Sequence, residues 1–206
     1  MGEGNEFHRN LEEILLAISA KYRLRKEENL QFYQAILQQF HTFRGQENID
    51  IQDAWVLDFG AGNLLMVLAS IDSVIKFDTH IAPMISTHKN DHLLCLLETA
   101  ADFPETLITP KTLRDKFVGL FSPSAAMSGM PGKFSEKYHC LSADEERLQL
   151  VIKKELPRYL ATIRHISLEF FGHSCLVQVN SSLIRKKETL QLIEASVQLS
   201  SMLGAK

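Results

Sequence analysis

Short apolar runs separated by turn-forming residues fill the middle of the chain, and they constrain its fold more than any other feature. They are bounded by glycine, asparagine, aspartate or proline, and they cover Ala54–Phe59, Leu64–Ser70, Val74–Asp78, His92–Thr99 and Leu107–Ile108. Runs of this length with these flanks favour strands over helices. Because short turns join them, they predict a mainly antiparallel sheet.

Helical periodicity precedes this sheet. Apolar residues recur every three or four positions, which predicts two amphipathic N-terminal helices near residues 8–22 and 27–43, the second ending at Gly45. Helices before a run of antiparallel strands indicate an α+β fold.

The C-terminal third predicts a helix, a hairpin and another helix. Ser142 and Glu145 are spaced as a capping box, and Pro157 predicts a kink or break in the helix that follows. Apolar residues then alternate on either side of Gly172-His173, which predicts a C-terminal hairpin whose core face carries Ile166, Leu168, Phe170, Cys175, Val177 and Val179. A long C-terminal helix is expected from Leu183 to Leu203.

The stretch "DFPETLITPKTLRDKFVGLFS" (Asp102–Ser122) predicts a strand end and then a short helix that begins with proline. Thr109 can cap this helix, Pro110 suits its first position, and Gly119 ends it. The segment Ser122–Gly132 is small, polar and broken by proline and glycine, which indicates a loop. We expect a single α+β domain over residues 1–206, with two subdomains divided near residues 122–132.

Composition limits the classes of function. The 22 basic and 25 acidic residues give a net charge of −3, so the chain lacks the basic footprint of a nucleic-acid-binding protein. Cys95, Cys140 and Cys175 are odd in number and widely spaced, which indicates reduced thiols of an intracellular protein. No run of about 18 apolar residues is present, so no transmembrane segment is expected. We therefore predict a cytoplasmic, or membrane-associated, protein.

The segment "VLDFGAGNLL" (Val56–Leu65) resembles the first motif of class I methyltransferases. Asp58, Gly60 and Gly62 match that motif, and Asp78 stands where a carboxylate could bind the ribose of S-adenosylmethionine. Leu64 replaces the third glycine that is usual there. The alternative interpretation is that Gly60–Asn63 forms a hairpin turn between two strands.

A second resemblance depends on the order of several motifs: "NLL" at Asn63, "FD" at Phe77, "DFPETLITPKTLRDKFVGLF", "KFSEKYHCLSADEE" and "LEFFGHSCLVQV". Over about residues 10–200, this order resembles an uncharacterised family of bacterial proteins, many of which carry membrane helices ahead of a soluble domain. Phe134–Tyr138 and Glu169–Gly172 match its Phe-Ser-x-x-Tyr and Glu-x-x-Gly motifs, whereas Thr79 replaces a usual aromatic residue. The resemblance implies no assigned reaction and no catalytic residues.

Two further groups of residues have the chemistry of possible sites. His88, Asp91 and His92 superficially resemble a zinc motif, but ligands four apart need a helix and this segment is expected to enter a strand, so no metal site is predicted. Basic residues surround the short helix and follow the loop, and they could contact a protein partner or an anionic membrane surface: Lys111, Arg114, Lys116, Lys133 and Lys137.

These patterns predict a non-enzymatic binding or interaction module without cofactor, in the cytoplasm or at the cytoplasmic face of a membrane. The alternative is an S-adenosylmethionine-dependent methyltransferase that uses Asp58, Gly60, Gly62 and Asp78.

Overall fold

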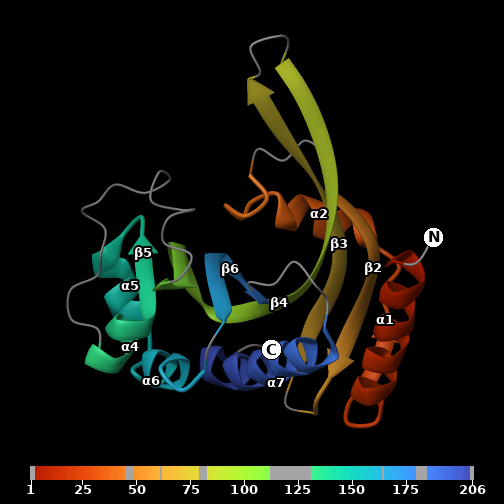
Figure 1. Cartoon of the computed structure of the whole chain (residues 1–206). Coiled ribbons are helices and arrows are strands. Elements are labelled where there is room, and N and C mark those ends of the chain that lie inside the picture. Colours follow the sequence, from red (N-terminus) through yellow and green to blue (C-terminus); the bar gives the residue numbers. More distant parts are fainter. Residues whose placement is uncertain are drawn as a thin grey trace.

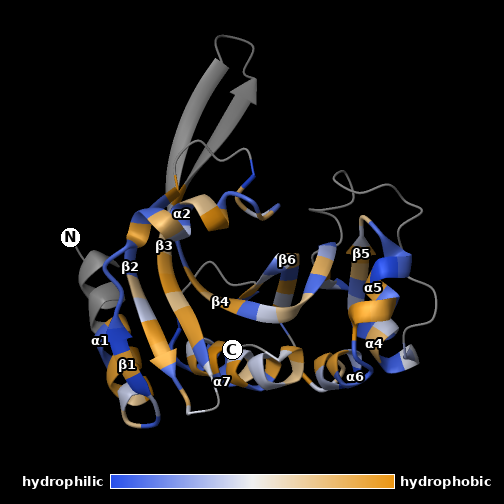
Figure 2. Ribbon diagram, turned by 180° about the vertical axis from the view of Figure 1, so that it is seen from behind, coloured by the Kyte–Doolittle hydropathy of each residue, from blue (hydrophilic) through white to orange (hydrophobic). Residues whose placement is uncertain are grey.

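The computed structural model of the chain describes residues 3–44, 49–60, 62–78, 83–111, 131–163, 165–179 and 185–204. The elements, labelled in Figure 1 except for β1, which Figure 2 labels, are in chain order α1 (Glu3–Ser19), β1 (Arg23–Lys26), α2 (Leu30–Leu37), β2 (Ile49–Asp58), β3 (Asn63–Asp78), β4 (Pro83–Pro110), α4 (Gly132–Lys137), β5 (Tyr138–Ser142), α5 (Glu145–Val151), α6 (Glu155–Leu160), β6 (Ile166–Val179) and α7 (Lys186–Leu203).

A six-stranded antiparallel sheet forms the centre of the fold, and this confirms the predicted α+β class. The strands follow the order β1-β2-β3-β4-β5, and β6 also pairs with β4. The 28-residue strand β4 thus pairs with three neighbours, and Figure 1 shows it curving from β3 towards β5.

The two faces of the sheet carry separate hydrophobic clusters. One cluster joins the strands to α1, α5, α6 and α7, for example through Ile14, Leu148, Leu160 and Leu199. The other joins the opposite face to α2 and the turn after it, through Leu37, Phe40 and Phe43. Figure 2 shows α2 on one side of the sheet and α7 on the other.

Several strands are longer than predicted. β3 joins the two predicted runs Leu64–Ser70 and Val74–Asp78, and β4 joins His92–Thr99 to Leu107–Ile108. The polar residues between the runs do not end the strands because their backbones pair across the sheet, as Asp72 does with Lys89. The short strand β1 was not predicted, because Arg23–Lys26 carries one apolar residue among three basic ones.

The prediction that a helix starts at Thr109-Pro110 is wrong. Both residues belong to β4, where Thr109 pairs with His139 and Pro110 with Tyr138. Proline has no N–H to donate, but it is tolerated at the end of a strand, where the ladder stops. The rest of the predicted helix, from residue 112 to Gly119, lies outside the described residues, as does most of the predicted loop Ser122–Gly132.

The predicted C-terminal hairpin is also wrong, although its core face is right. β6 is one strand that pairs with β4 along both halves, and Gly172, with φ of +59°, lies where the register shifts. The shift explains why Phe170 and Cys175, five positions apart, both point into the same cluster. A shift in the pairing register thus lies where a turn was expected, and the strand continues through it.

The helices before and after β6 agree in part with the prediction. Asp144, not Ser142, is the N-cap of α5, and its carboxylate accepts the backbone N–H of Arg147 at 2.9 Å. Ser142 belongs to β5, and its hydroxyl lies 3.0 Å from that of Thr106. The expected break near Pro157 is confirmed, because α5 ends at Val151 and α6 begins at Glu155.

Candidate binding groove

A groove of about 540 Å³ lies between the end of α6, the first residues of β6 and one side of α7. The apolar part of its lining comprises Ile163, Ile166 and Ala195. Ile166 and Ala195 are buried because they also belong to the main hydrophobic cluster. The core of the protein thus supplies the base of the groove, and polar residues of α6 and α7 supply its sides.

The polar side chains from α7 follow one another at intervals of three residues: Glu188, Gln191 and Glu194. At about 1.5 Å per residue, the two glutamates lie about 9 Å apart along the helix axis. Lys187 lines the groove beside them. Opposite α7, the end of α6 contributes Tyr159 and the following turn contributes Thr162.

Glu188 carries an acceptor without a donor. Its Oε2 atom is buried and has no hydrogen-bond partner, while Oε1 lies 3.7 Å from the guanidinium of Arg185. Leaving a buried charged acceptor unpaired costs free energy, so such atoms are uncommon in folded proteins. Because Oε2 has almost no accessible surface, a ligand in the groove cannot reach this oxygen.

Glu194 and Tyr159 lie at the other end of the polar row. Glu194 accepts a hydrogen bond from the ammonium of Lys21 at 2.8 Å, and both side chains are exposed. Burial, and secondarily the charge of Glu194, raise the pKa of the Tyr159 phenol. The phenol thus keeps its proton at neutral pH and remains a hydrogen-bond donor.

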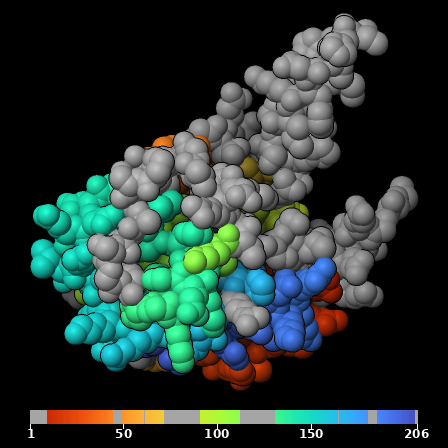
Figure 3. Space-filling model, turned by 60° about the vertical axis from the view of Figure 1, so that its left-hand side comes forward, coloured from red at the N-terminus to blue at the C-terminus, as the bar shows by residue number. Residues whose placement is uncertain are grey.

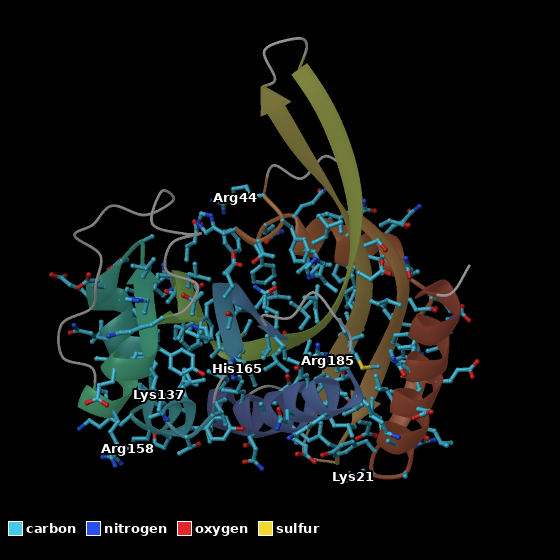
Figure 4. All side chains as sticks on the ribbon, viewed as in Figure 1. Lys21, Arg44, Lys137, Arg158, His165 and Arg185 are labelled. Carbon is cyan, nitrogen blue, oxygen red and sulfur yellow. The ribbon has the colours of Figure 1, made fainter. Side chains whose placement is uncertain are left out.

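His165 lines the groove from a strained backbone conformation. Its φ of +67° makes it the one non-glycine residue with a positive φ in the described part of the chain. This conformation costs on the order of 1–3 kcal/mol, and such strain often occurs at functional sites. Figure 4 places His165 beside α7, where the chain enters β6.

A second polar cluster lies on the opposite face of the sheet, beneath the turn that follows α2. Glu169 is 1% exposed, and it accepts hydrogen bonds from the backbone N–H groups of His41 and Thr42 and from the Thr42 hydroxyl. Burial raises the pKa of Glu169 against the effect of these donors. Glu105 forms an ion pair with Arg44, at 2.9 Å, and its carboxylate also contacts the imidazole of His41. The cluster attaches the turn to the sheet by bonds among its own members.

The residues of the methyltransferase interpretation are not brought together. The turn prediction is confirmed: β2 and β3 pair antiparallel, Asp58 accepts the Gly60 N–H at 2.8 Å, and Gly62 accepts the Phe59 N–H at 3.2 Å. Leu64 continues into a strand rather than a helix. Asp78 ends β3, about 50 Å along the strand from Asn63 at about 3.3 Å per residue.

The predicted basic surface is described only in part. Lys111 and Lys133 are exposed, at the end of β4 and on α4, and Figure 3 shows the side of the molecule that carries α4, β5 and α5. The ammonium of Lys137 donates to the carbonyl of Ala161 at the end of α6, which gives this lysine a structural role. Arg114 and Lys116 lie outside the described residues.

His92 belongs to β4, as predicted, but His88, which was expected in a turn before the strand, belongs to β4 as well. Burial lowers the pKa of His92, and the neighbouring Asp91 bonds instead to the Ser70 hydroxyl. Within the described ranges, no three or more His, Cys, Asp or Glu side chains form a group that could hold a metal ion. Nor does any helix in those ranges have the length and apolarity needed to cross a membrane.

Comparison with protein-family models, with curated proteins and with solved structures found no match. The resemblance to the bacterial family, and the function of the chain, therefore remain predictions.

The sequence did not point to the groove or to the buried carboxylates. The spacing of Glu188, Gln191 and Glu194 is typical of the solvent-exposed side of an amphipathic helix. Glu169 lies at a position where an alternating strand is expected to carry an exposed polar side chain. A usable signal was the pair Phe170-Phe171 after Glu169, since consecutive aromatic residues place apolar side chains on both faces of a strand.

Proposed function

We propose that this protein is a non-enzymatic binding module that holds a small organic molecule in the groove between α6, β6 and α7. The observation that supports it is the groove itself, which is about 540 Å³ in volume and has a lining of both apolar and polar side chains. Ligand sites are commonly about 300–1,000 Å³ in volume, with an apolar lining and a few polar groups that orient the ligand.

The chemistry of the lining favours binding over catalysis. The Thr162 hydroxyl donates to the carbonyl of Tyr159 at 2.6 Å, so it is not activated by a neighbouring base. On the other face of the sheet, Glu169 and Glu105 already hold His41, Thr42 and Arg44. Carboxylates engaged in this way serve the fold rather than a reaction.

The experiment is a thermal-shift and calorimetry comparison of three proteins with a panel of small molecules. The panel contains glucose, maltose, myo-inositol, putrescine, succinate and S-adenosylmethionine. The proteins are the parent, Gln191→Trp, which fills the groove, and Gln198→Trp, which places the same side chain on an exposed position of α7 outside it.

At least one compound should raise the Tm of the parent and of Gln198→Trp but not that of Gln191→Trp. The proposal fails if no compound binds, or if binding is equal in all three proteins. Binding of S-adenosylmethionine alone that is lost in Gly60→Ala and kept in Gln191→Trp would support the methyltransferase alternative instead.

We also propose that the module works in the cytoplasm. In support, Cys95, Cys140 and Cys175 are all buried and none forms a disulfide bond, as in proteins of reducing compartments. Cell fractionation with an antibody to the protein tests the location, and recovery from an oxidising compartment would contradict it.

A further inference from the structure

We infer that Lys137 and Tyr138, neighbours at the end of α4 and the start of β5, hold the α6–β6 connector in the shape that binds the ligand of the groove. The connector joins the end of α6 to the start of β6, and the structure describes residues 161–163 and His165 of it. The inference depends on the proposed function, because it assigns positioning residues to the groove proposed there. Neither Lys137 nor Tyr138 lines the groove itself.

The connector and the first residue of β6 form one side of the groove. Their lining residues are Thr162, Ile163, His165 and Ile166. The opposite side comes from α7, which is anchored by buried residues along most of its length. Because α7 is fixed by this packing, the shape of the groove depends on where the connector is held.

Local hydrogen bonds hold the connector only to α6. In the described part of the chain, the backbone N–H groups of residues 161–163 donate to the carbonyls of Pro157, Tyr159 and Leu160. These bonds continue the last turn of the helix, so they do not fix the connector against the rest of the fold. His165 adds a strained backbone with φ of +67°, and such a conformation persists only where surrounding contacts maintain it.

Lys137 supplies a contact from outside α6. Its ammonium donates to the carbonyl of Ala161, the residue that follows the last residue of α6. The last carbonyls of a helix have no partner within the helix and carry the negative end of its dipole, so a cation is favourable there. α4 lies beside α6, and Figure 4 labels Lys137 there. The start of the connector is thus tied to α4.

Tyr138 contacts the chain on both sides of His165. Its phenol donates to the carbonyl of Ile163 at 3.4 Å, and the backbone N–H of Ile166 hydrogen-bonds to the phenol oxygen. Burial raises the pKa of Tyr138 to about 12, so the phenol keeps the proton that it donates. The ring stacks on that of Phe134, with centroids 5.5 Å apart, which fixes its position. One side chain thus spans the strained residue.

These contacts should raise affinity without touching the ligand. A connector that is held in place before binding has less conformational freedom to lose when a ligand enters the groove. Loss of either contact should therefore loosen the connector and weaken binding, while α7 and the sheet keep their packing.

The test measures backbone NMR order parameters, and binding by calorimetry, in Lys137→Met and Tyr138→Phe. Both changes remove the polar group and keep most of the apolar side chain. In the parent, the amides of Ile163 and His165 should have order parameters of about 0.85, as in rigid structure, and these should fall to about 0.6 in both variants. Order parameters report motion within the folded protein, so a loss of stability alone leaves them unchanged.

The controls remove the same groups elsewhere. Lys133→Met changes an exposed lysine of α4, and Tyr33→Phe changes a half-buried tyrosine on the opposite face of the sheet. Both controls should keep the order parameters of the parent.

The ligand probes are glucose, maltose, myo-inositol, putrescine, succinate and S-adenosylmethionine. A compound that binds the parent but not Gln191→Trp should bind both controls as tightly as the parent. Its Kd should be about three- to tenfold higher in Lys137→Met and in Tyr138→Phe, as expected for loss of a hydrogen bond that orders the connector.

The outcomes separate the two proposals. Unchanged order parameters in both Lys137→Met and Tyr138→Phe overturn the inference, whichever compounds bind. Order parameters that fall while the Kd stays the same also overturn it, since the position of the connector would then not affect binding. If no compound binds the parent, the proposed function falls, and the binding role of the two residues falls with it. Circular dichroism shows whether each variant is folded, and Tyr138→Phe provides the test should Lys137→Met unfold.

Discussion

Two glutamates show how the same residue type serves different purposes in this molecule. Glu169 is buried in the sheet, and its carboxylate accepts three hydrogen bonds from the turn after α2. Glu188 is partly exposed on α7, and its buried Oε2 has none. Glu169 is therefore expected to affect stability, whereas Glu188 is expected to affect binding only because it lines the groove.

Glu169 should make stability depend on pH. Because its pKa is raised in the folded protein, folding favours the protonated form. That contribution is fully present below the pKa of the unfolded chain and is lost as the pH rises through the folded pKa. The advantage in unfolding free energy of the parent over Glu169→Gln should thus shrink as the pH rises above about 4, the ordinary pKa of a glutamate in an unfolded chain.

Urea unfolding at several pH values measures this difference. His41, whose pKa is lowered mainly by burial, titrates in both proteins, so comparing them isolates Glu169. An advantage that grows towards neutral pH would mean that the hydrogen bonds outweigh burial and that the pKa is lowered instead.

Gly60 should tolerate alanine poorly because of its backbone alone. Its φ is +81°, and no atom lies within 4 Å of the position that a Cβ would take. Alanine in this conformation costs about 1–2 kcal/mol. Denaturant unfolding of Gly60→Ala should show a loss of this size, whereas Gly132→Ala, with equal space and no positive φ, should show none. Equal effects would argue that the turn adapts to a side chain.

At the scale of the element, β6 shows what sequence periodicity can and cannot predict. Alternation identified the side chains that enter the main hydrophobic cluster, but it did not show that the opposite face of β6 is buried too. It did not distinguish a turn from a bulge at Gly172, since glycine with positive φ suits both. The deciding contacts are pairs such as Leu97 with Cys175, which are distant in sequence.

The groove could not be predicted from the sequence either, because its lining residues are distant in sequence. Tyr159 and Ala195 come from different helices, and nothing local in either segment indicates that they share a cavity. The hairpin turn at Gly60–Asn63 was predictable because all its determinants lie within a few adjacent residues.

Phe170 tests the assigned faces of β6. It is fully buried and stacks on Phe103, with ring centroids 4.4 Å apart. Phe170→Ala should lower the unfolding free energy by about 3–5 kcal/mol. The same change at Phe32, which is 58% exposed on α2, should cost less than about 1 kcal/mol. A small loss at Phe170 would mean that β6 presents its other face to the core.

At the scale of the whole molecule, the basic-surface hypothesis remains a prediction. If the surface contacts anionic lipid, each basic residue should contribute about 1 kcal/mol, and added salt should weaken binding. Co-sedimentation with anionic vesicles should fall when Lys111, Arg114 and Lys116 are changed to Ser. Changing Lys153, Lys154 and Arg158 to Ser removes the same charge elsewhere and should have less effect. Equal binding by the parent and both variants, or binding that does not depend on anionic lipid, would contradict the hypothesis.

The sharing of β4 among three strands has a consequence for how the chain folds. β2 and β3 are joined by a tight turn, so they can pair soon after they are synthesised. Pairing of β4 with β6 instead closes a long loop, since Leu94 pairs with Gln178 about 80 residues later. While the chain is being synthesised, the backbone groups of β4 that later pair with β6 are therefore unpaired. During that interval the edge is open to intermolecular pairing, so we expect the chain to be prone to aggregation until β6 has paired.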